Sequence, residues 1–226
     1  MSNLGCQAGG RREEFQLDER SKPIAETRSH RMQALTLKIF RSFLALLLAT
    51  FVPVALRGTA SRLAIEDING TQHDLSDPNT KATLLLFVAT DCPISNSYAP
   101  EINRIVETYA PSKIAVYIVY VDASVGVREI REHARAFSFK APLVLDDAHS
   151  LVHLVGGTVT PEAAVVSREG KLLYLGRIDD LYFDYGKRRA APTRQDLRDA
   201  LDTILSGKTI AVPTTKPIGC FISNEK

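Results

Sequence analysis

Cysteine is scarce in this sequence, with three among 226 residues, at positions 6, 92 and 220. No two of them have the Cys-x-x-Cys spacing that many thiol enzymes use, because Ser95 takes the fourth place in the stretch that begins at Cys92. A chain of this length can bury a core without disulfide cross-links. Because Cys92 has no cysteine three residues away, a redox role for it would need a second thiol from elsewhere in the chain or from another molecule.

The sequence also lacks an apolar run long enough to cross a membrane. The apolar stretch 42–56 has about 15 residues, whereas a membrane-spanning helix needs roughly 20. Lys38 and Arg41 flank its start, and the small residues Gly58 and Ala60 follow it, which is typical of a secretory signal with cleavage after Ala60. This pattern predicts export to the periplasm or another extracytoplasmic space. An uncleaved N-terminal membrane anchor and a buried core helix are the alternatives.

These features divide the chain into four segments. Met32 lies where a signal peptide would begin, and the residues before it are polar and show no periodicity. The expected segments are 1–31, disordered or a mis-assigned start; 32–60, a signal peptide or anchor; 61–207, one globular domain; and 208–226, a tail that carries Cys220.

A basic stripe is missing as well. Without residues 1–60 the chain keeps 19 Lys and Arg (28 − 9) against 21 Asp and Glu (26 − 5), so the mature domain is close to neutral and no nucleic-acid partner is expected. Removing the same segment leaves Cys92 and Cys220. An even pair of cysteines in an oxidising compartment suggests a disulfide, either structural or catalytic.

The order of the expected elements indicates an α/β fold. An N-terminal β-hairpin turns at Asn69–Gly70, and a second hairpin turns at Glu169–Gly170. Between and after them come strands at 82–89, 113–122 and 141–147 and helices at 98–110, 124–139, 148–156 and 192–207, the last with Thr193 as N-cap. This alternation predicts a mixed central sheet with helices on both faces and a C-terminal tail extension.

Cys92 lies where a buried strand gives way to a helix, in the stretch "ATDCPISNSYAPE". Free N–H groups and the partial positive charge at a helix start stabilise a thiolate, and Pro93 suits the first helical turn. The alternative is an inert buried cysteine. The polar neighbours from Thr90 to Asn96 favour the reactive interpretation.

A second segment, "GGTVTPEAAVV", contains the Thr160–Pro161 bond, a candidate cis peptide at the start of a hairpin strand. Together, "ATLLLFVATDCP", "TVTPEAAVV" and "YLGRIDD" resemble the thioredoxin superfamily, and within it the exported redoxins of the alkyl hydroperoxide reductase/thiol-specific antioxidant and TlpA-like type. The resemblance implies a thioredoxin-like fold from about 63 to 207. It also implies that Thr160 and Pro161 face the Cys92 thiol and bind substrate together with Thr90 and Pro93.

The sequence departs from the motif of each branch of that family. TlpA-like members have a cysteine at the place of Ser95, and copper-carrying Sco-type members have one at the place of Asn96. The peroxiredoxin pattern Pro-x-x-x-Thr-x-x-Cys meets Leu85 and Ala89 instead of proline and threonine. The reaction is therefore expected to be either thiol–disulfide exchange or an antioxidant peroxide reduction, with a thiol or disulfide protein or a peroxide as substrate, an external electron donor, and no cofactor.

Cys220 lies beyond the last expected helix, in "KPIGCFI", where Gly219 permits a close backbone approach. It is a candidate resolving thiol for Cys92; a purely structural bridge and no bridge at all are the other interpretations. Two other classes of function stay open: a copper chaperone that uses the two cysteines and a histidine, and a binding module without turnover.

Two further groups of side chains are noted. His149 and His153 have the i, i+4 spacing of a metal pair or of a solvated helix face, and no metal is expected. The segment 177–180, Arg-Ile-Asp-Asp, is expected to form ion pairs, with a substrate role as the alternative.

Overall fold

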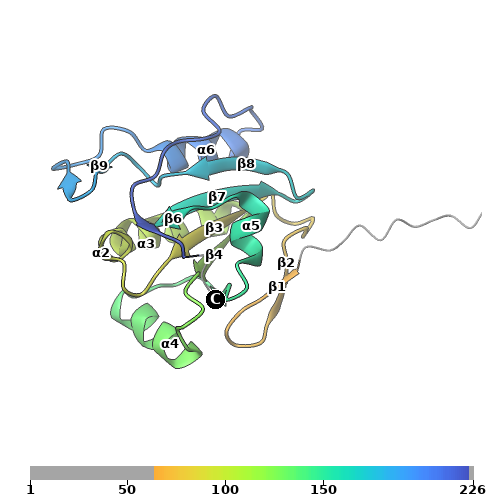
Figure 1. Cartoon of the computed structure of the whole chain (residues 1–226). Helices are drawn as coiled ribbons and strands as arrows, with labels where there is room; N and C mark the ends of the chain where they lie inside the picture. The colour runs from red at the N-terminus through yellow and green to blue at the C-terminus, as the bar shows by residue number, and fades with distance from the viewer. Residues whose placement is uncertain (1–63, 224–226) are drawn as a thin grey trace, which may run out of the picture. The chain divides into compact units, whose positions relative to one another are not determined.

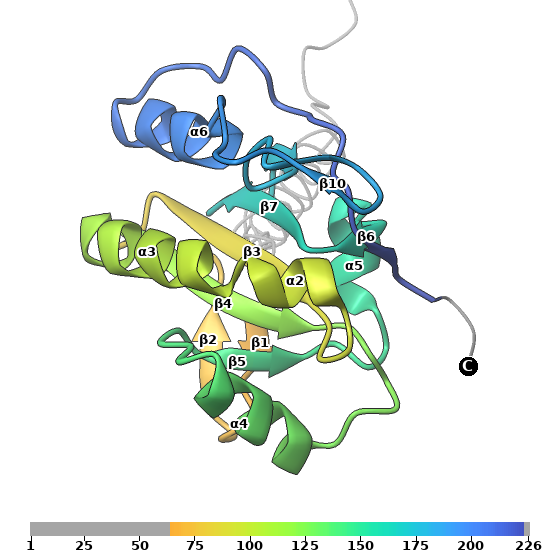
Figure 2. The ribbon, with the colours of Figure 1, turned by 90° about the vertical axis from the view of Figure 1, so that its left-hand side faces the viewer.

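The computed structural model describes residues 64–223, and they form an α/β fold around a five-stranded mixed sheet. The strand order is β5-β4-β3-β7-β8, with β4, β3, β7 and β8 labelled in Figure 1 and β5 beside β4 in Figure 2. The sheet strands are β3 (Ala82–Val88), β4 (Ile114–Tyr120), β5 (Leu143–Leu145), β7 (Glu162–Ser167) and β8 (Leu172–Gly176). The predicted fold class is confirmed.

The middle strand β3 explains this arrangement. All seven of its residues are buried, as expected for an apolar run covered on both faces. It pairs in parallel with β4 and antiparallel with β7. Its side chains alternate, so Leu84 and Leu86 enter one core and Leu85 and Phe87 the other.

Helices cover the two faces unequally (Figure 2). The larger core lies under α3 (Ala99–Tyr109), α4 (Val127–Ala136) and α6 (Asp196–Leu205). The smaller core lies under α5 (Ser150–Val155) and the N-terminal hairpin of β1 (Ala64–Glu66) and β2 (Gln72–Asp74). The hairpin turn places Gly70 at φ +81°, a conformation that favours glycine.

The helix expected at 98–110 is α3 (Ala99–Tyr109), and a short separate helix, α2 (Pro93–Ser97), follows Cys92; the two meet at Tyr98. One expectation about the helices is wrong in detail. Thr193 does not cap the last helix: α6 begins at Asp196 after Gln195, which makes no side-chain cap bond. The Thr193 hydroxyl instead donates to the buried Asp180 carboxylate at 2.5 Å, because that charge needs donors.

The segment after β8 forms a hairpin, the last helix and a C-terminal tail that comes back to the sheet. A small hairpin of β9 (Tyr182–Asp184) and β10 (Lys187–Arg188) leads into α6. The tail then runs beside β8, where a parallel bridge joins Leu175 and Thr214, and it ends in β11 (Cys220–Phe221). β11 pairs antiparallel with β6 (Val159–Thr160), a short strand just before β7.

The predictions for residues 1–60 lie outside the described residues. Within 64–223, no helix is long and apolar enough to span a membrane.

Candidate active site

Cys92 lies at the end of the loop that joins β3 to α2, and its side chain is fully buried, 0% exposed. It is the N-cap residue of α2, and its sulfur accepts a hydrogen bond from the Ser95 backbone N–H at 3.4 Å. The Cys92 thiol donates to the carbonyl oxygen of Thr160 at 3.1 Å. The sulfur therefore lies between the start of a helix and the backbone of β6.

The β6 segment is positioned by its own neighbours. The Thr160–Pro161 peptide bond is cis. Directly after it, the buried Glu162 carboxylate accepts hydrogen bonds from the backbone N–H groups of Thr158, at 2.7 Å, and Val159, at 3.3 Å. Burial raises the pKa of Glu162, although these hydrogen bonds oppose the rise. Glu162 thus fixes the strand whose carbonyl oxygen meets the Cys92 thiol.

The tail brings the second cysteine to the same place. In the β11–β6 ladder Cys220 pairs with Thr160, so both cysteines contact one backbone position. Burial, together with the neighbouring Cys92 sulfur and the Asp91 charge, raises the pKa of the Cys220 thiol to about 12. Cys220 therefore keeps its proton at neutral pH.

Gly219 allows this approach. A Cβ atom at position 219 would lie 2.1 Å from the Thr160 carbonyl oxygen, which is a backbone atom that cannot move aside easily. The Gly219 carbonyl oxygen accepts a hydrogen bond from the Tyr185 hydroxyl, which lies at the turn of the β9–β10 hairpin. A contact from a different element thus secures the tail next to its cysteine.

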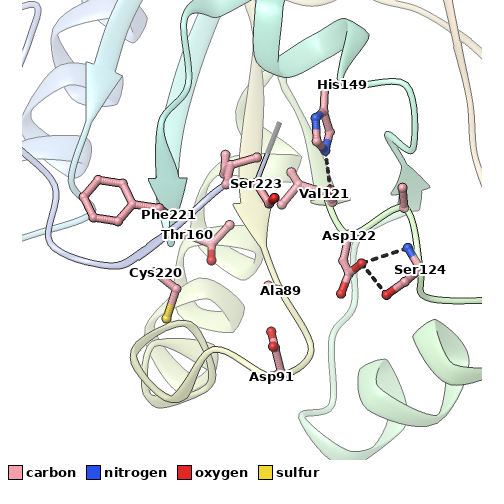
Figure 3. Close-up of a pocket in the computed structure, with 12 residues that line it drawn as sticks. Ala89, Asp91, Val121, Asp122, Ser124, His149, Thr160, Cys220, Phe221 and Ser223 are labelled. Carbon is pink, nitrogen blue, oxygen red and sulfur yellow. Dashed lines mark hydrogen bonds between the residues drawn. The ribbon is translucent and has the colours of Figure 1, made fainter. Parts of the chain in front are cut away.

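A cavity of about 500 Å³ opens beside the cysteine pair (Figure 3). Thr160, Cys220 and Phe221 line it on one side, and Asp91, Asp122 and His149 line it from the loops after β3, β4 and β5. Cys92 is not among the lining residues. The cavity therefore gives access to Cys220 and to the outer edge of β6, but not to the buried sulfur.

The structure brings together Cys92, Cys220 and Thr160–Pro161. Thr90 lies just outside this group: its carbonyl oxygen accepts from the Asn96 side chain at 3.0 Å, and its hydroxyl is 3.5 Å from Glu129. Pro93 is exposed on α2. The Ser95 hydroxyl, at the place of the missing cysteine, is buried and has no hydrogen-bond partner among the described residues.

Sequence reasoning missed Glu162 and Tyr185. An acidic residue at the start of the apolar stretch "AAVV" was a usable signal for Glu162, since a buried carboxylate must have donors. Tyr185 lies in an exposed loop that gives no pattern, and only the folded tail shows what it contacts.

The two other groups have structural partners. His149 hydrogen-bonds the Val121 carbonyl oxygen through Nε2 at 2.6 Å, and its ring meets that of His153 edge-on at 6.3 Å between centroids. Among residues 64–223 no three His, Cys, Asp or Glu side chains are grouped so that they could hold a metal ion. In segment 177–180, Arg177 pairs with Asp196 at 2.7 Å, and Asp179 accepts from the Tyr98 hydroxyl at 2.5 Å.

Comparison with known proteins decides the family. Residues 57–175, more than half of the chain, match the AhpC/TSA family. The chain belongs to the AhpC/TSA family. This confirms the resemblance drawn from the sequence, and the mixed five-stranded sheet is that of a thioredoxin-like fold.

Relatives and solved structures agree with this assignment. The chain is 25% identical over 119 residues, 53% of its length, to 67% of the thiol-disulfide oxidoreductase ResA of Geobacillus thermodenitrificans. Its structure is similar to a hypothetical protein from Sinorhizobium meliloti, with TM-score 0.62 and 26% identity over 72% of this chain and 91% of that one. An uncharacterized conserved protein from Geobacillus kaustophilus gives TM-score 0.62 and 22% identity over 74% and 90%. This AhpC/TSA member is thus a thioredoxin-fold relative of thiol-disulfide oxidoreductases.

Proposed function

We propose that this protein is an exported thiol–disulfide oxidoreductase in which Cys92 is the nucleophile and Cys220 the resolving thiol. The observation that carries the proposal is the meeting of both cysteines at Thr160: one donates to its carbonyl oxygen and the other pairs with it in the β11–β6 ladder. Export rests on the signal-like segment 32–60, and an uncleaved segment would anchor the protein to the membrane through residues 42–56.

The surroundings of the two sulfur atoms differ, and this difference indicates which cysteine attacks the substrate and which resolves the mixed disulfide. Cys220 holds its proton, because burial and nearby negative groups raise its pKa. Cys92 receives a backbone N–H bond from Ser95, which would stabilise negative charge on its sulfur. Cys92 is therefore the better candidate for the attacking thiolate. Cys220 acts second, by attacking the Cys92 sulfur after Cys92 has formed a mixed disulfide with the substrate.

The reaction proceeds in two exchanges. The Cys92 thiolate attacks one sulfur of a substrate disulfide; the substrate S–S bond breaks, and the first substrate sulfur leaves as a thiolate. Cys220 then attacks the Cys92 sulfur, and its proton passes to the second substrate sulfur as that group leaves. The first substrate thiolate takes a proton from solvent, which balances the proton that Cys92 released on ionisation. The substrate thus gains two electrons and two protons in total, and the protein ends with a Cys92–Cys220 disulfide, which a dithiol electron donor must reduce.

Thr160 and Pro161 would form the wall against which substrate lies, and Thr90 and Pro93 would border it. The exposed Pro93 and the half-buried Thr90 lie on the surface around the buried sulfur, which supports a contact role rather than a chemical one.

Peroxide reduction by the same pair is the second candidate, because the chain is an AhpC/TSA member. The Cys92 thiolate would attack one peroxide oxygen, the O–O bond would break, and the other oxygen would take a proton from solvent and leave as water or an alcohol. Cys220 would then displace water from the Cys92 sulfenic acid to form the disulfide. Ala89, which borders the cavity where the peroxiredoxin pattern has threonine, offers no hydroxyl to orient a peroxide. Disulfide exchange is therefore the preferred reaction.

Mass spectrometry of the full chain tests the mechanism, with Cys6→Ser as the shared background. Treatment with oxidised glutathione should produce a Cys92–Cys220 link. The Cys220→Ser variant should instead accumulate a glutathione adduct on Cys92, and Cys92→Ser should not form the internal link. If Cys220→Ser turned over repeatedly without an accumulating adduct, Cys220 would not be the resolving thiol. A faster reaction with hydrogen peroxide than with oxidised glutathione would favour the second candidate.

A further inference from the structure

A chain of side-chain hydrogen bonds runs from the larger core to the loop that carries Cys92. The Tyr120 hydroxyl lies 3.0 Å from Nδ1 of His133, and Nε2 of the same ring lies 2.9 Å from Oδ1 of Asn96. The Asn96 Nδ2 group donates to the Thr90 carbonyl oxygen at 3.0 Å. These side chains come from β4, α4 and α2, which pack on the same core (Figure 2).

The hydrogen bonds of this chain can run in one direction only. The Thr90 carbonyl oxygen is an acceptor, so the NH₂ group of Asn96 must face it and Oδ1 must face His133. Because Oδ1 is also an acceptor, Nε2 of neutral His133 carries the ring proton, and Nδ1 accepts from the Tyr120 hydroxyl. Burial lowers the pKa of His133, and the charge of Glu129 on the same helix opposes this lowering. His133 is therefore mainly neutral at pH 7.

Asn96 holds the Cys92 loop at two points. Its backbone N–H donates to the Cys92 carbonyl oxygen at 2.9 Å, and its side chain binds the Thr90 carbonyl oxygen two residues earlier. The Cys92 sulfur accepts from the Ser95 N–H at 3.4 Å. The length of this sulfur contact depends on where the loop lies against the first turn of α2, and the two Asn96 bonds set that position.

The side chain of Ser95 gives the loop no such support. Its hydroxyl is buried, with the residue 1% exposed, and it has no hydrogen-bond partner among the described residues. Positions 95 and 96 are the places at which other branches of the family have a second cysteine. Of these two positions, it is Asn96 whose side chain contacts the Cys92 loop.

We propose that Asn96 is a positioning residue for Cys92 and that His133 fixes the orientation of its amide. The inference rests on the proposed function, since it concerns the thiolate that attacks the substrate disulfide. His133 donates to Oδ1, which keeps the Asn96 NH₂ group on the Thr90 carbonyl oxygen. The loop then holds the Cys92 sulfur against the N–H at the start of α2. A hydrogen bond to a charged sulfur is stronger than one to a neutral thiol, so this placement favours the thiolate.

Asn96→Ala is the direct test of this role. It removes the side-chain bond to Thr90 and leaves the backbone bond to Cys92 in place. Asn103→Ala is the matched control, because Asn103 is also half-buried and its Nδ2 donates to a backbone carbonyl oxygen, that of Phe137, at 2.9 Å.

Two substitutions of His133 test the orientation of the amide. His133→Leu fills most of the space of the ring without a donor, so the Asn96 amide is free to turn its oxygen toward Thr90. His133→Gln is the conservative variant, because its side-chain NH₂ group can donate to Oδ1 from the place of Nε2.

The measurement is the rate at which iodoacetamide alkylates Cys92, followed over pH in the full chain. Cys6→Ser and Cys220→Ser are present in every protein, so that Cys92 is the sole thiol. The thiolate attacks the iodoacetamide carbon and displaces iodide, whereas the thiol does not react. The pH at which the rate reaches half its maximum therefore reports the ionisation of Cys92, whatever fraction of time the sulfur is exposed.

Asn96→Ala should reduce the thiolate fraction about fivefold at neutral pH, the effect of one hydrogen bond, and so raise the midpoint by roughly 0.7 pH unit. Asn103→Ala should keep the parent's midpoint, although it destabilises the protein to urea by a similar amount. His133→Leu should raise the midpoint by less than Asn96→Ala, and His133→Gln should return it to the parent's value. Nuclear magnetic resonance of the ring nitrogens should find the proton of neutral His133 on Nε2.

The outcomes separate this inference from the function on which it rests. A midpoint that Asn96→Ala leaves unchanged, or that Asn103→Ala raises equally, would overturn the positioning role. The oxidoreductase proposal would still stand if Cys92 formed its glutathione adduct. Equal shifts in His133→Leu and His133→Gln, or a proton on Nδ1, would overturn the role of His133. A raised midpoint in Asn96→Ala alone, without any glutathione adduct on Cys92 in the parent, would support the positioning of the thiol and overturn the proposed function.

Discussion

Oxidation of Cys92 and Cys220 to a disulfide should stabilise the protein strongly against unfolding. The two residues are 128 positions apart in the chain (220 − 92), so a bond between them closes most of the described domain into one loop. In the folded state both cysteines already meet at Thr160, through the Cys92 hydrogen bond and the Cys220 pairing. The bond therefore restricts the unfolded chain much more than the folded one.

The chain-entropy relation gives the size of the effect. For a loop of 128 residues the entropy lost by the unfolded chain corresponds to about 5 kcal/mol at 25 °C. This is an upper value, because the unfolded chain retains some structure and any native-state strain subtracts from it. We expect the free energy of unfolding to rise by about 3–5 kcal/mol on oxidation, a large fraction of the stability of a domain of this size.

Urea unfolding followed by circular dichroism measures this difference. The Cys6→Ser chain is unfolded once in its oxidised form, with the Cys92–Cys220 link verified by mass spectrometry, and once with a phosphine reductant. Cys220→Ser, made in the same background, is the control and should unfold at the same urea concentration under both conditions. A linked protein that unfolds together with the reduced one would refute the reasoning that the tail is already in place.

Three further predictions concern the scaffold. Burial favours the neutral form of the Asp180 carboxyl, but hydrogen bonds from Thr193 and Arg194 outweigh burial and lower the Asp180 pKa to about 2. The ionised carboxylate therefore stabilises the folded state above pH 3.8, and this stabilisation is lost as the pH falls toward 2. Asp180→Asn should lose about 2 kcal/mol at pH 7 and flatten the stability curve between pH 4 and 2 in urea titrations; an unchanged slope would contradict this. Burial also lowers the pKa of His133 below 6.5, so the unfolded chain takes up the proton at a higher pH than the folded protein. The free energy of unfolding should therefore fall as the pH drops through 6.5. His133→Gln should remove this pH dependence, and a dependence that survives the substitution must come from another group. Ile102→Ala, at a side chain with 0% exposure in the larger core, should cost about 2–5 kcal/mol by thermal or urea unfolding, and a loss below 1 kcal/mol would mean that the core refills the space.

The local sequence was enough to predict the scaffold and the first half of the site. The largely apolar run 82–88 predicts a buried strand, and the Asn69–Gly70 pair predicts a chain reversal, because short apolar β-prone runs and Asn-Gly pairs are typical of these structures. The same local rules place Cys92 at the junction of a strand and a helix, and the Thr160–Pro161 bond marks a special backbone position.

Sequence patterns predicted the wrong N-cap where a buried carboxylate accepts the hydrogen bond of the capping side chain. Thr193 has the residue type of an N-cap, but its hydroxyl donates to Asp180, which lies buried 13 positions earlier. The N-cap of the helix is instead Gln195, two residues later than expected. Which donor a buried carboxylate uses depends on packing and cannot be read from neighbouring residues.

The sequence by itself determined the sheet, its covering helices and the position of one cysteine, because these follow from periodicity and turn chemistry within short segments. Only the tertiary structure decided that the tail returns to β6, that Gly219 gives it room, and that Cys220 meets Cys92 at Thr160. A contact between residues 128 positions apart depends on how β8, the β9–β10 hairpin and α6 direct the chain between them. No local pattern at either cysteine carries that information.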